Sequence, residues 1–240
     1  MKRFGDRLIS LLIWIIALPV FCLVCLKIIL ASYLLPSRAL EPLIKFLCRV
    51  VLFVCGIRIR LHGREHFDPS RQYVVMMNHV NFFDPLVLYA AFPGWARAVE
   101  EESHFRWPVY GPTIRRLGVI PVSRSDSVRA KESMKLAASL IRSHRDFSFI
   151  VLPEGRRTRD GKLEPFKRGG FLLAVETGLE ILPVVQVGAR RISRKGSLLI
   201  RPGIFDVFIE PPISPEGYFK ANIEEYVESV RSVFLRRVPG

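Results

Sequence analysis

The chain has 240 residues, 50% of them hydrophobic, and carries a formal net charge of +14, from 36 Lys and Arg against 22 Asp and Glu. A chain of this length and apolar content can bury a sizeable core, which excludes a wholly disordered protein. The excess of positive charge favours an anionic partner, such as nucleic acid, phospholipid headgroups or an acidic carrier protein, but does not choose among them.

The first predicted element is a long apolar helix. An uncharged run, LISLLIWIIALPVFCLVCL (residues 8–26), follows a basic start at Lys2, Arg3 and Arg7. At ~1.5 Å per residue, this run approaches the ~30 Å thickness of a hydrocarbon core. A cleaved signal peptide has a shorter apolar region and a small-x-small cleavage site, and the sequence before Lys27 contains no such site. We therefore expect the segment to remain in the protein.

A second apolar stretch, residues 39–57, has a different character. Glu41, Lys45 and Arg49 interrupt it at spacings that suit a helix in the membrane interface better than a spanning helix. The intervening LLPSR predicts a break between two helices. Two arrangements remain open for the leader (residues 1–56): a spanning helix, or a helical hairpin that enters one leaflet. The proline within the first helix and the amphipathic second helix favour the hairpin.

All four cysteines lie in the leader. They are Cys22, Cys25, Cys48 and Cys55. The single C-x2-C pair has neither a second pair nor a nearby histidine to complete a metal site, and no cysteine lies in the polar part of the chain, where a nucleophilic thiol is expected. We interpret the cysteines as small hydrophobic residues and expect neither a metal nor a bound cofactor.

After the leader, short apolar runs alternate with helical patterns. Several of these runs are apolar on both faces, which is typical of strands covered by helices. The predicted strands are IRIRLH (57–62), YVVMM (73–77), GVIPV (118–122), FSFIVL (147–152), ILPVVQV (181–187), SLLIR (197–201) and FDVFIE (205–210).

Two helices separate or follow these strands. Residues 127–143 repeat apolar side chains at helical spacing, with Asp126 or Ser125 available as the N-cap. Residues 222–238 carry a second amphipathic pattern. The sequence therefore predicts an α/β domain over residues 57–240, in which helices flank a largely parallel sheet, attached to a membrane-associated leader.

The first candidate for chemistry is MMNHVNFFDP (76–85), directly after a predicted strand. His79 and Asp84 would face about 140° apart on an unbroken helix at ~3.6 residues per turn, so they meet only if a turn intervenes. Pro85 predicts a helix start here, with Asp84 as its cap and His79 on the preceding loop. A carboxylate beside an imidazole fixes its tautomer and prepares it to act as a base. From this segment alone, a catalytic pair and a simple helix cap are equally good interpretations.

A second polar segment favours the catalytic interpretation. PEGRRTRDG (153–161) follows a predicted strand, and PFKRGG (165–170) leads into a helix. A basic loop at the carboxyl end of a strand is typical of an anion site, although solvated basic loops are common. The basic residues are Arg156, Arg157, Arg159, Lys167 and Arg168.

Together these segments resemble the lysophospholipid acyltransferase family, and the bacterial 1-acylglycerol-3-phosphate acyltransferases in particular. Four family blocks occur in order over about residues 75–187, and the leader is similar to the family's membrane-binding helices. His79 and Asp84 match the H-x4-D catalytic block. GVIPVSR is similar to the second block, with Arg124 retained.

The third block, P-E-G-T-R, is matched by Glu154, Gly155 and Arg157, with Arg156 where the family usually has threonine. Pro183 fits the proline of the fourth block. By this resemblance, Glu154, Gly155 and Arg157 belong to the acceptor site, with Arg124 as a further candidate.

The resemblance implies a direct transfer without a covalent acyl-enzyme. His79, oriented by Asp84, would deprotonate the hydroxyl of a lysophospholipid, which attacks the thioester of acyl-CoA or acyl-ACP, the co-substrate. The implied acceptor is lysophosphatidic acid and the product phosphatidic acid. We expect the protein at the phospholipid surface of the cell membrane, peripheral or monotopic, with its catalytic domain on the cytoplasmic side.

One departure from the family bears on the acceptor. Many members carry a lysine, thought to hold the acceptor's phosphate, where this chain has the acidic run Glu100, Glu101 and Glu102. Glu101 stands at about the lysine's position and would repel a phosphate unless it points away or pairs with Arg97 or Arg106.

This departure keeps other functions open. One is an acyltransferase for another lysolipid, such as a lyso-ornithine lipid. Another is a non-catalytic membrane protein that binds anionic lipid through its basic surface. A nucleic-acid binder would explain the charge but neither the leader nor the histidine block, so we expect no nucleic-acid partner.

Overall fold

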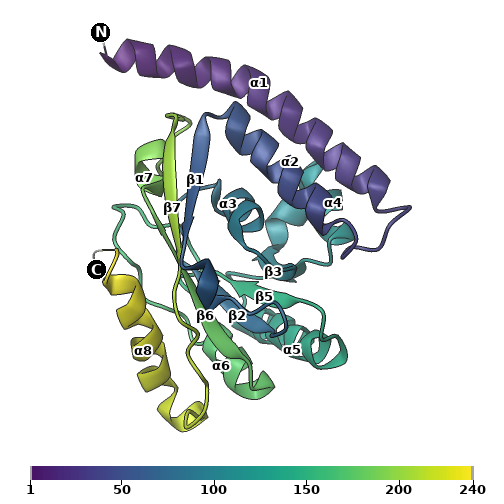
Figure 1. Ribbon diagram of the computed structural model, residues 1–240, viewed down its shortest axis with the longest axis vertical. Coiled ribbons are helices and arrows are strands. Elements are labelled where there is room, and N and C mark those ends of the chain that lie inside the picture. Colours follow the sequence, from purple (N-terminus) through teal and green to yellow (C-terminus); the bar gives the residue numbers. More distant parts are fainter. Residues whose placement is uncertain (1, 239–240) are drawn as a thin grey trace.

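The computed structural model describes residues 2–238. Within them, seven strands form one sheet in the order β1-β7-β6-β2-β5-β3-β4 (Figure 1). The strands are β1 (Ile57–His62), β2 (Tyr73–Met77), β3 (Ala96–Glu101), β4 (Ile120–Val122), β5 (Ser148–Val151), β6 (Glu180–Val187) and β7 (Gly203–Ile209). The helices are α1 (Lys2–Ala31), α2 (Glu41–Val54), α3 (Asp84–Ala91), α4 (Tyr110–Arg116), α5 (Ser127–Ser143), α6 (Gly169–Thr177), α7 (Ala189–Ile192) and α8 (Ile223–Leu235), with short 3-10 helices η1 (Arg64–His66), η2 (Glu102–Arg106) and η3 (Lys220–Asn222).

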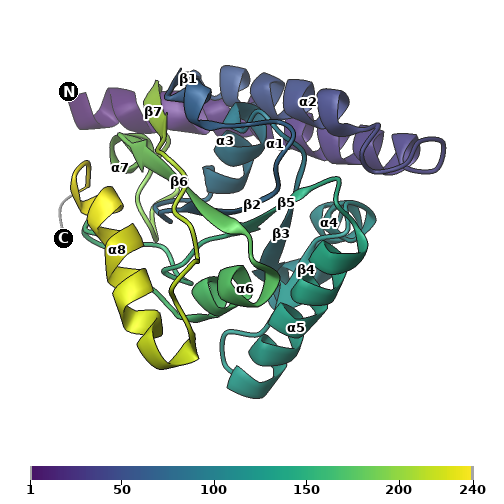
Figure 2. The ribbon, with the colours of Figure 1, turned by 60° about the horizontal axis from the view of Figure 1, so that its bottom comes forward.

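The sheet is parallel except where β6 pairs with β7. This confirms the predicted α/β fold with a largely parallel sheet. β2 lies between β5 and β6, and all of its residues are buried. Helices α1, α2 and α3 lie on one side of the sheet, and α5, α6 and α8 on the other (Figure 2). A central strand covered on both faces explains the unbroken apolar run at residues 73–77.

Most predicted strands are confirmed, with ends that shift by at most two residues, but the strand predicted at residues 197–201 is wrong. These residues form an irregular segment against α1. The carbonyl oxygen of Leu198 accepts hydrogen bonds from the side chains of Ser10 and Trp14, and the backbone N–H of Ile200 donates to Ser10. Backbone groups that a strand would pair with a neighbour are bonded here to side chains of the leader.

Strand β3 was missed by the sequence analysis. Arg97, Glu100 and Glu101 interrupt its apolar pattern, so the segment does not read as a buried strand. In the fold, β3 lies near the edge of the sheet between β5 and β4, and its acidic residues find partners there. Ion pairs between β3 and other elements cannot be predicted from the local sequence pattern of β3.

The two predicted amphipathic helices are confirmed as α5 and α8. The carboxylate of Asp126 accepts the backbone N–H groups of Val128 and Arg129, so Asp126 is the N-cap of α5. α8 runs from Ile223 to Leu235, slightly shorter than predicted, and buries one face. The buried side chains of α8 are Ile223, Tyr226, Val227, Val230, Val233 and Phe234.

The leader forms two helices joined by a turn that contains Pro36 and Ser37, as predicted. α1 continues through Pro19 and packs against α2 and α4. Within residues 2–238, the Phe4–Ala31 segment is the one helix long and apolar enough to cross a membrane. Its buried side chains are Ser10, Ile13, Ala17, Val24, Cys25 and Ile28, whereas most other side chains on it are exposed and apolar. This exposed apolar face indicates association with a membrane.

The leader also shares a core with the α/β part, which begins at the predicted boundary with β1 at Ile57. α2 packs on α3 and β1 and buries its apolar face. The residues of this face are Ile44, Leu47, Cys48, Val51 and Leu52. The second helix of the hairpin is therefore packed against the α/β part.

Candidate active site

A short turn after β2 brings His79 and Asp84 together. The Nδ1 atom of His79 lies 2.6 Å from Oδ2 of Asp84. The same oxygen accepts the backbone N–H groups of Val80, at 2.6 Å, and Asn81, at 3.1 Å. The predicted contact between imidazole and carboxylate is thus confirmed.

The predicted role of Asp84 as a helix cap is wrong. Asp84 is the first residue of α3, and the preceding Phe83 occupies the N-cap position without a side-chain cap. The Asp84 side chain turns back into the loop, where three donors converge on one oxygen, and it is fully buried at 0% exposure. A carboxylate held by charge-assisted bonds on one side fixes the position of the imidazole.

The loop after β5 holds the backbone of His79 from the other side. The backbone N–H of His79 donates to Oε1 of Glu154, at 2.5 Å, and its carbonyl oxygen accepts from the N–H of Thr158, at 2.9 Å. The two loops meet because β2 and β5 are parallel neighbours, with Met76 paired to Val151, so their carboxyl ends emerge side by side.

Glu154 is one of the most enclosed acidic residues of the site. It is 3% exposed, and its second oxygen accepts the N–H of Glu164 at 2.9 Å. Burial raises the pKa of Glu154 to about 7, although its two backbone hydrogen bonds oppose this shift. Because both carboxylate oxygens bind backbone amides, the geometry favours a positioning role for Glu154 over the predicted contact with the acceptor.

Two further residues of this loop, Gly155 and Arg157, line a cavity together with Lys167. Gly155 has a φ of +64°, and a Cβ atom there would lie 2.8 Å from Cε of Lys167. A glycine thus permits both the left-handed turn and the close passage of the lysine side chain. The carbonyl oxygen of Arg157 accepts from Nζ of Lys195, at 3.0 Å.

Each glutamate of the acidic run 100–102 contacts a basic side chain. Glu101 binds Arg124, with Oε2 of the glutamate 2.6 Å from Nε of the arginine, and Glu102 binds Arg129 at 2.6 Å. Its partner is therefore Arg124 and neither Arg97 nor Arg106, the two residues considered from the sequence. Glu101 is paired with Val122 of β4 in parallel register, and Arg124 lies two residues after Val122, which explains the pairing. Arg124 and Glu101 together line the cavity.

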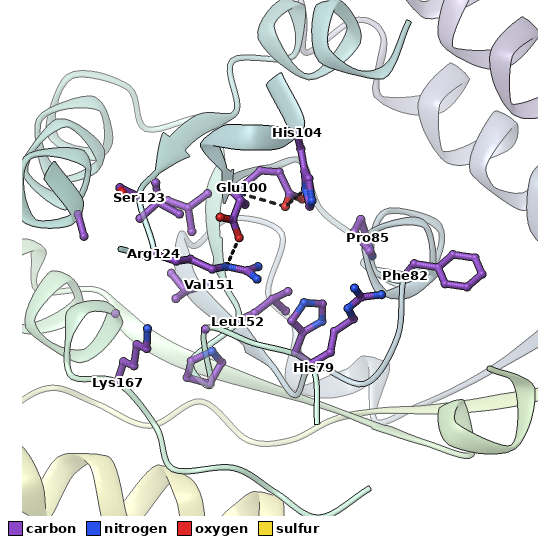
Figure 3. Close-up of a pocket in the computed structure, with 18 of the residues that line it drawn as sticks. His79, Phe82, Pro85, Glu100, His104, Ser123, Arg124, Val151, Leu152 and Lys167 are labelled. Atoms are coloured by element: carbon purple, nitrogen blue, oxygen red, sulfur yellow. Dashed lines mark hydrogen bonds and ion pairs between the residues drawn. The ribbon is translucent and has the colours of Figure 1, made fainter. Parts of the chain in front are cut away.

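The first residue of the acidic run forms a second imidazole–carboxylate pair that the sequence analysis missed. Oε1 of Glu100 lies 2.8 Å from Nδ1 of His104, and both residues line the cavity (Figure 3). Burial opposes ionisation of Glu100, but the hydrogen bond and charge of His104 lower its pKa on balance. The His104 ring packs on Trp107, with 4.2 Å between ring centroids. The spacing Glu-x-x-x-His was the available signal.

His79 lies in the wall of a large, mainly apolar cavity of about 1520 Å³. Figure 3 shows His79, Arg124 and Lys167 around the same hollow. Its apolar lining comes from α1 and from segments of the α/β part, and includes Trp14, Ala17, Leu18, Phe21, Phe82, Leu86, Val99, Leu152, Leu172 and Leu173. The site therefore combines an imidazole with one ring nitrogen free of the carboxylate, several basic groups, and apolar space larger than the ~300–1,000 Å³ of common small-molecule pockets.

Comparison with known proteins agrees with this chemistry. A family model described as Acyltransferase matches residues 58–187. A 1-acyl-sn-glycerol-3-phosphate acyltransferase from Limnanthes douglasii is 30% identical over 191 residues, which cover 80% of this chain and 67% of that protein. The alpha form of the enzyme from Mus musculus is 30% identical over 184 residues, covering 76% and 64%. This chain thus spans about two thirds of the length of these relatives.

The fold also matches a solved structure. The crystal structure of the 1-acyl-sn-glycerophosphate (LPA) acyltransferase PlsC from Thermotoga maritima aligns with a TM-score of 0.82, over 98% of this chain and 95% of that one. The two sequences are 24% identical, so this match concerns the fold.

Proposed function

Because the chain belongs to the acyltransferase family, alongside 1-acyl-sn-glycerol-3-phosphate acyltransferases, we propose that it acylates the free hydroxyl of lysophosphatidic acid to give phosphatidic acid. The observation that carries the mechanism is the 2.6 Å contact between His79 and a buried Asp84 in the wall of an apolar cavity.

The proposed reaction needs one base and no covalent enzyme intermediate. Asp84 holds the proton on Nδ1 of His79, so Nε2 carries the lone pair that removes the acceptor's hydroxyl proton. The hydroxyl oxygen attacks the thioester carbonyl and forms a C–O bond. The C–S bond then breaks, and the proton on Nε2 passes to the departing thiolate. Asp84 stabilises the imidazolium that exists between these two proton transfers.

We propose that Arg157 and Arg124, with Lys167, bind the acceptor's phosphate. All three line the cavity. Glu101 forms an ion pair with Arg124, so its charge is compensated and need not repel an anionic headgroup. Glu154 and Gly155 act on this site indirectly, through the backbone of His79 and the path of Lys167.

We propose a monotopic attachment to the membrane, with the catalytic domain on the cytoplasmic side. α1 packs along the domain, and its other side is apolar and exposed, which suits a hairpin embedded in one leaflet. The net charge of +14 favours the anionic cytoplasmic leaflet. The donor is an acyl thioester, either acyl-CoA or acyl-ACP.

Purified protein in detergent micelles, supplied with each donor in turn, tests this function. The acceptors are lysophosphatidic acid, a lyso-ornithine lipid and lysophosphatidylcholine, and mass spectrometry identifies the acylated product. We expect acylation of lysophosphatidic acid. A product from the lyso-ornithine lipid alone would assign the acceptor differently, and lipid binding without thioester consumption would make the protein a non-catalytic lipid binder.

A further inference from the structure

The loop of residues 193–202, where the sequence predicts a strand, is fastened to the leader by polar contacts. The carbonyl oxygen of Leu198 accepts from Trp14 Nε1 at 2.6 Å and from Ser10 Oγ at 3.2 Å. Arg201 binds the carboxylate of Asp6 at 2.8 Å. The hydrogen bonds from Trp14 and Ser10 join the loop to residues 184 and 188 positions away in the sequence. The loop and the amino-terminal half of α1 therefore form one surface.

This surface exposes a large apolar side chain at the tip of the loop. Leu198 is 78% exposed, although its backbone is fastened to α1. The same part of α1 exposes further apolar side chains, namely Leu8, Leu11, Leu12, Ile15 and Leu18. Leu198 thus adds an exposed apolar side chain beside the helix whose exposed face we assign to the membrane.

Basic side chains gather at the base of the same loop. Arg190, Arg191 and Arg194 are exposed, and Lys195 is half-buried. Lys195 donates to the carbonyl oxygen of Arg157 at 3.0 Å, and desolvation, followed by the charges of Arg159 and Arg157, lowers its pKa. An apolar tip flanked by cations matches the chemistry of a bilayer that contains anionic lipids.

We propose that the 193–202 loop is a second membrane-contact element. Leu198 inserts into the bilayer beside α1, and Arg190, Arg191 and Arg194 bind anionic phospholipid headgroups. This inference depends on the proposed function in one respect only, namely that the enzyme acts at a membrane surface. Trp14, Phe82 and Ile200 line the cavity on the side of this loop, so the contact would hold that end of the cavity at the surface where lysolipids reside.

Insertion of the tip is tested with Leu198→Trp in the full chain, using vesicles of brominated phosphatidylcholine, which quench tryptophan at membrane depth. Relative to the native chain, we expect emission from the added tryptophan to fall by about half, because the loop tip reaches the acyl-chain boundary. The matched control is Leu136→Trp on α5, where the native leucine is 50% exposed and α5 lies far from α1 (Figures 1 and 2). Equal quenching of the two variants, or none for Leu198→Trp, would overturn the insertion.

The headgroup contact is tested by removing charge. We expect Arg191→Gln with Arg194→Gln to weaken binding to vesicles containing phosphatidylglycerol about 25-fold, since each basic residue near an anionic surface contributes ~1 kcal/mol. Binding to neutral phosphatidylcholine vesicles should not change. Arg142→Gln with Arg145→Gln on and after α5 removes the same charge away from the loop and is the control. If both double variants lose the same affinity for these vesicles, the loss comes from net charge alone and the proposed headgroup site is overturned.

The micelle assay separates this inference from the proposed function. Acyl transfer in micelles does not require docking to a bilayer, so the loop variants should keep their micellar activity. A native protein without transferase activity but with a quenched Leu198→Trp would refute the enzyme and leave the membrane contact intact.

Discussion

Two imidazole–carboxylate pairs place their histidines in the wall of the same cavity, and they differ in how they are held. His79 and Asp84 come from a loop and a helix start, and the carboxylate also binds two backbone amides. His104 and Glu100 lie four residues apart on one short segment, with side chains 27% and 18% exposed. In the first pair the surrounding chain fixes both groups. In the second pair the further contacts come from the same stretch of chain: Glu100 also accepts the backbone N–H of Glu101 and the hydroxyl of Tyr110, and the His104 ring packs on Trp107.

The comparison shows what distinguishes a base from a local ion pair. A base must hold one tautomer and one orientation throughout the reaction. Glu154 and Thr158 fix the backbone of His79, and Asp84 fixes its ring. An i,i+4 pair that is partly exposed contributes only modestly, and the backbone of His104 is bonded within its own segment, where its carbonyl oxygen accepts the N–H of Trp107 at 3.1 Å.

The largest predicted effect separates the two histidines. We expect His79→Ala to lower kcat at least ~100-fold, the lower end of what a positioned base contributes, and His104→Ala to lower it by less than ~3-fold. Acyl transfer to lysophosphatidic acid, followed by mass spectrometry, measures both. Comparable losses in the two variants would break the distinction drawn here.

The next largest effect distinguishes the carboxylate of Asp84 from that of Glu100. We expect Asp84→Asn to lower kcat about 100-fold, because an amide can no longer stabilise the imidazolium and can favour the wrong tautomer. We expect Glu100→Gln to lower kcat by less than ~3-fold, because the partly exposed pair that it forms with His104 is not proposed to act as the base. Circular dichroism checks that both variants are folded. Near-native turnover by Asp84→Asn would contradict the role of Asp84.

The third prediction concerns the stability of the loop that holds His79. The pKa of Glu154 is about 7 in the folded protein, above the usual value for a glutamate, so the folded state binds more protons between these values. Stability therefore falls as pH rises through this range. Relative to Glu154→Gln, we expect the native free energy of unfolding to fall by about 2 kcal/mol between pH 5 and pH 6.5. Denaturant unfolding at each pH measures it, and a constant difference would refute it.

We expect the smallest effect, a change in KM, from disruption of the Glu101–Arg124 ion pair at the end of β3. If Arg124 contacts the acceptor's phosphate, Glu101→Gln releases it and should lower the KM for lysophosphatidic acid about 3-fold, whereas Arg124→Gln should raise that KM about 5-fold, with little change in kcat. A neutral lysolipid acceptor is the control. Equal effects on charged and neutral acceptors would show that the pair acts on structure and not on headgroup binding.

Much of the site was predictable because its central part is local. Residues 79–84 form one turn, and the geometry of a histidine and an aspartate five positions apart, before a proline, requires such a turn. The role of Glu154 was not predictable from the residues. Its bond to His79 spans 75 positions and exists because β5 pairs with β2. The partner of Glu101 likewise depended on β3, whose charged residues concealed it as a strand.

By itself, the sequence determined the parallel α/β class, the capped helix at residues 127–143, the apolar leader and the position of His79 before Asp84. Each of these follows from periodicity or from contacts within a few residues. Only the tertiary structure decided which loops meet at His79, which arginine neutralises Glu101, and that residues 193–202 lie on α1. These contacts depend on strand order and on helix packing, since hydrogen bonds and ion pairs between distant segments form only after the hydrophobic core has set those segments side by side.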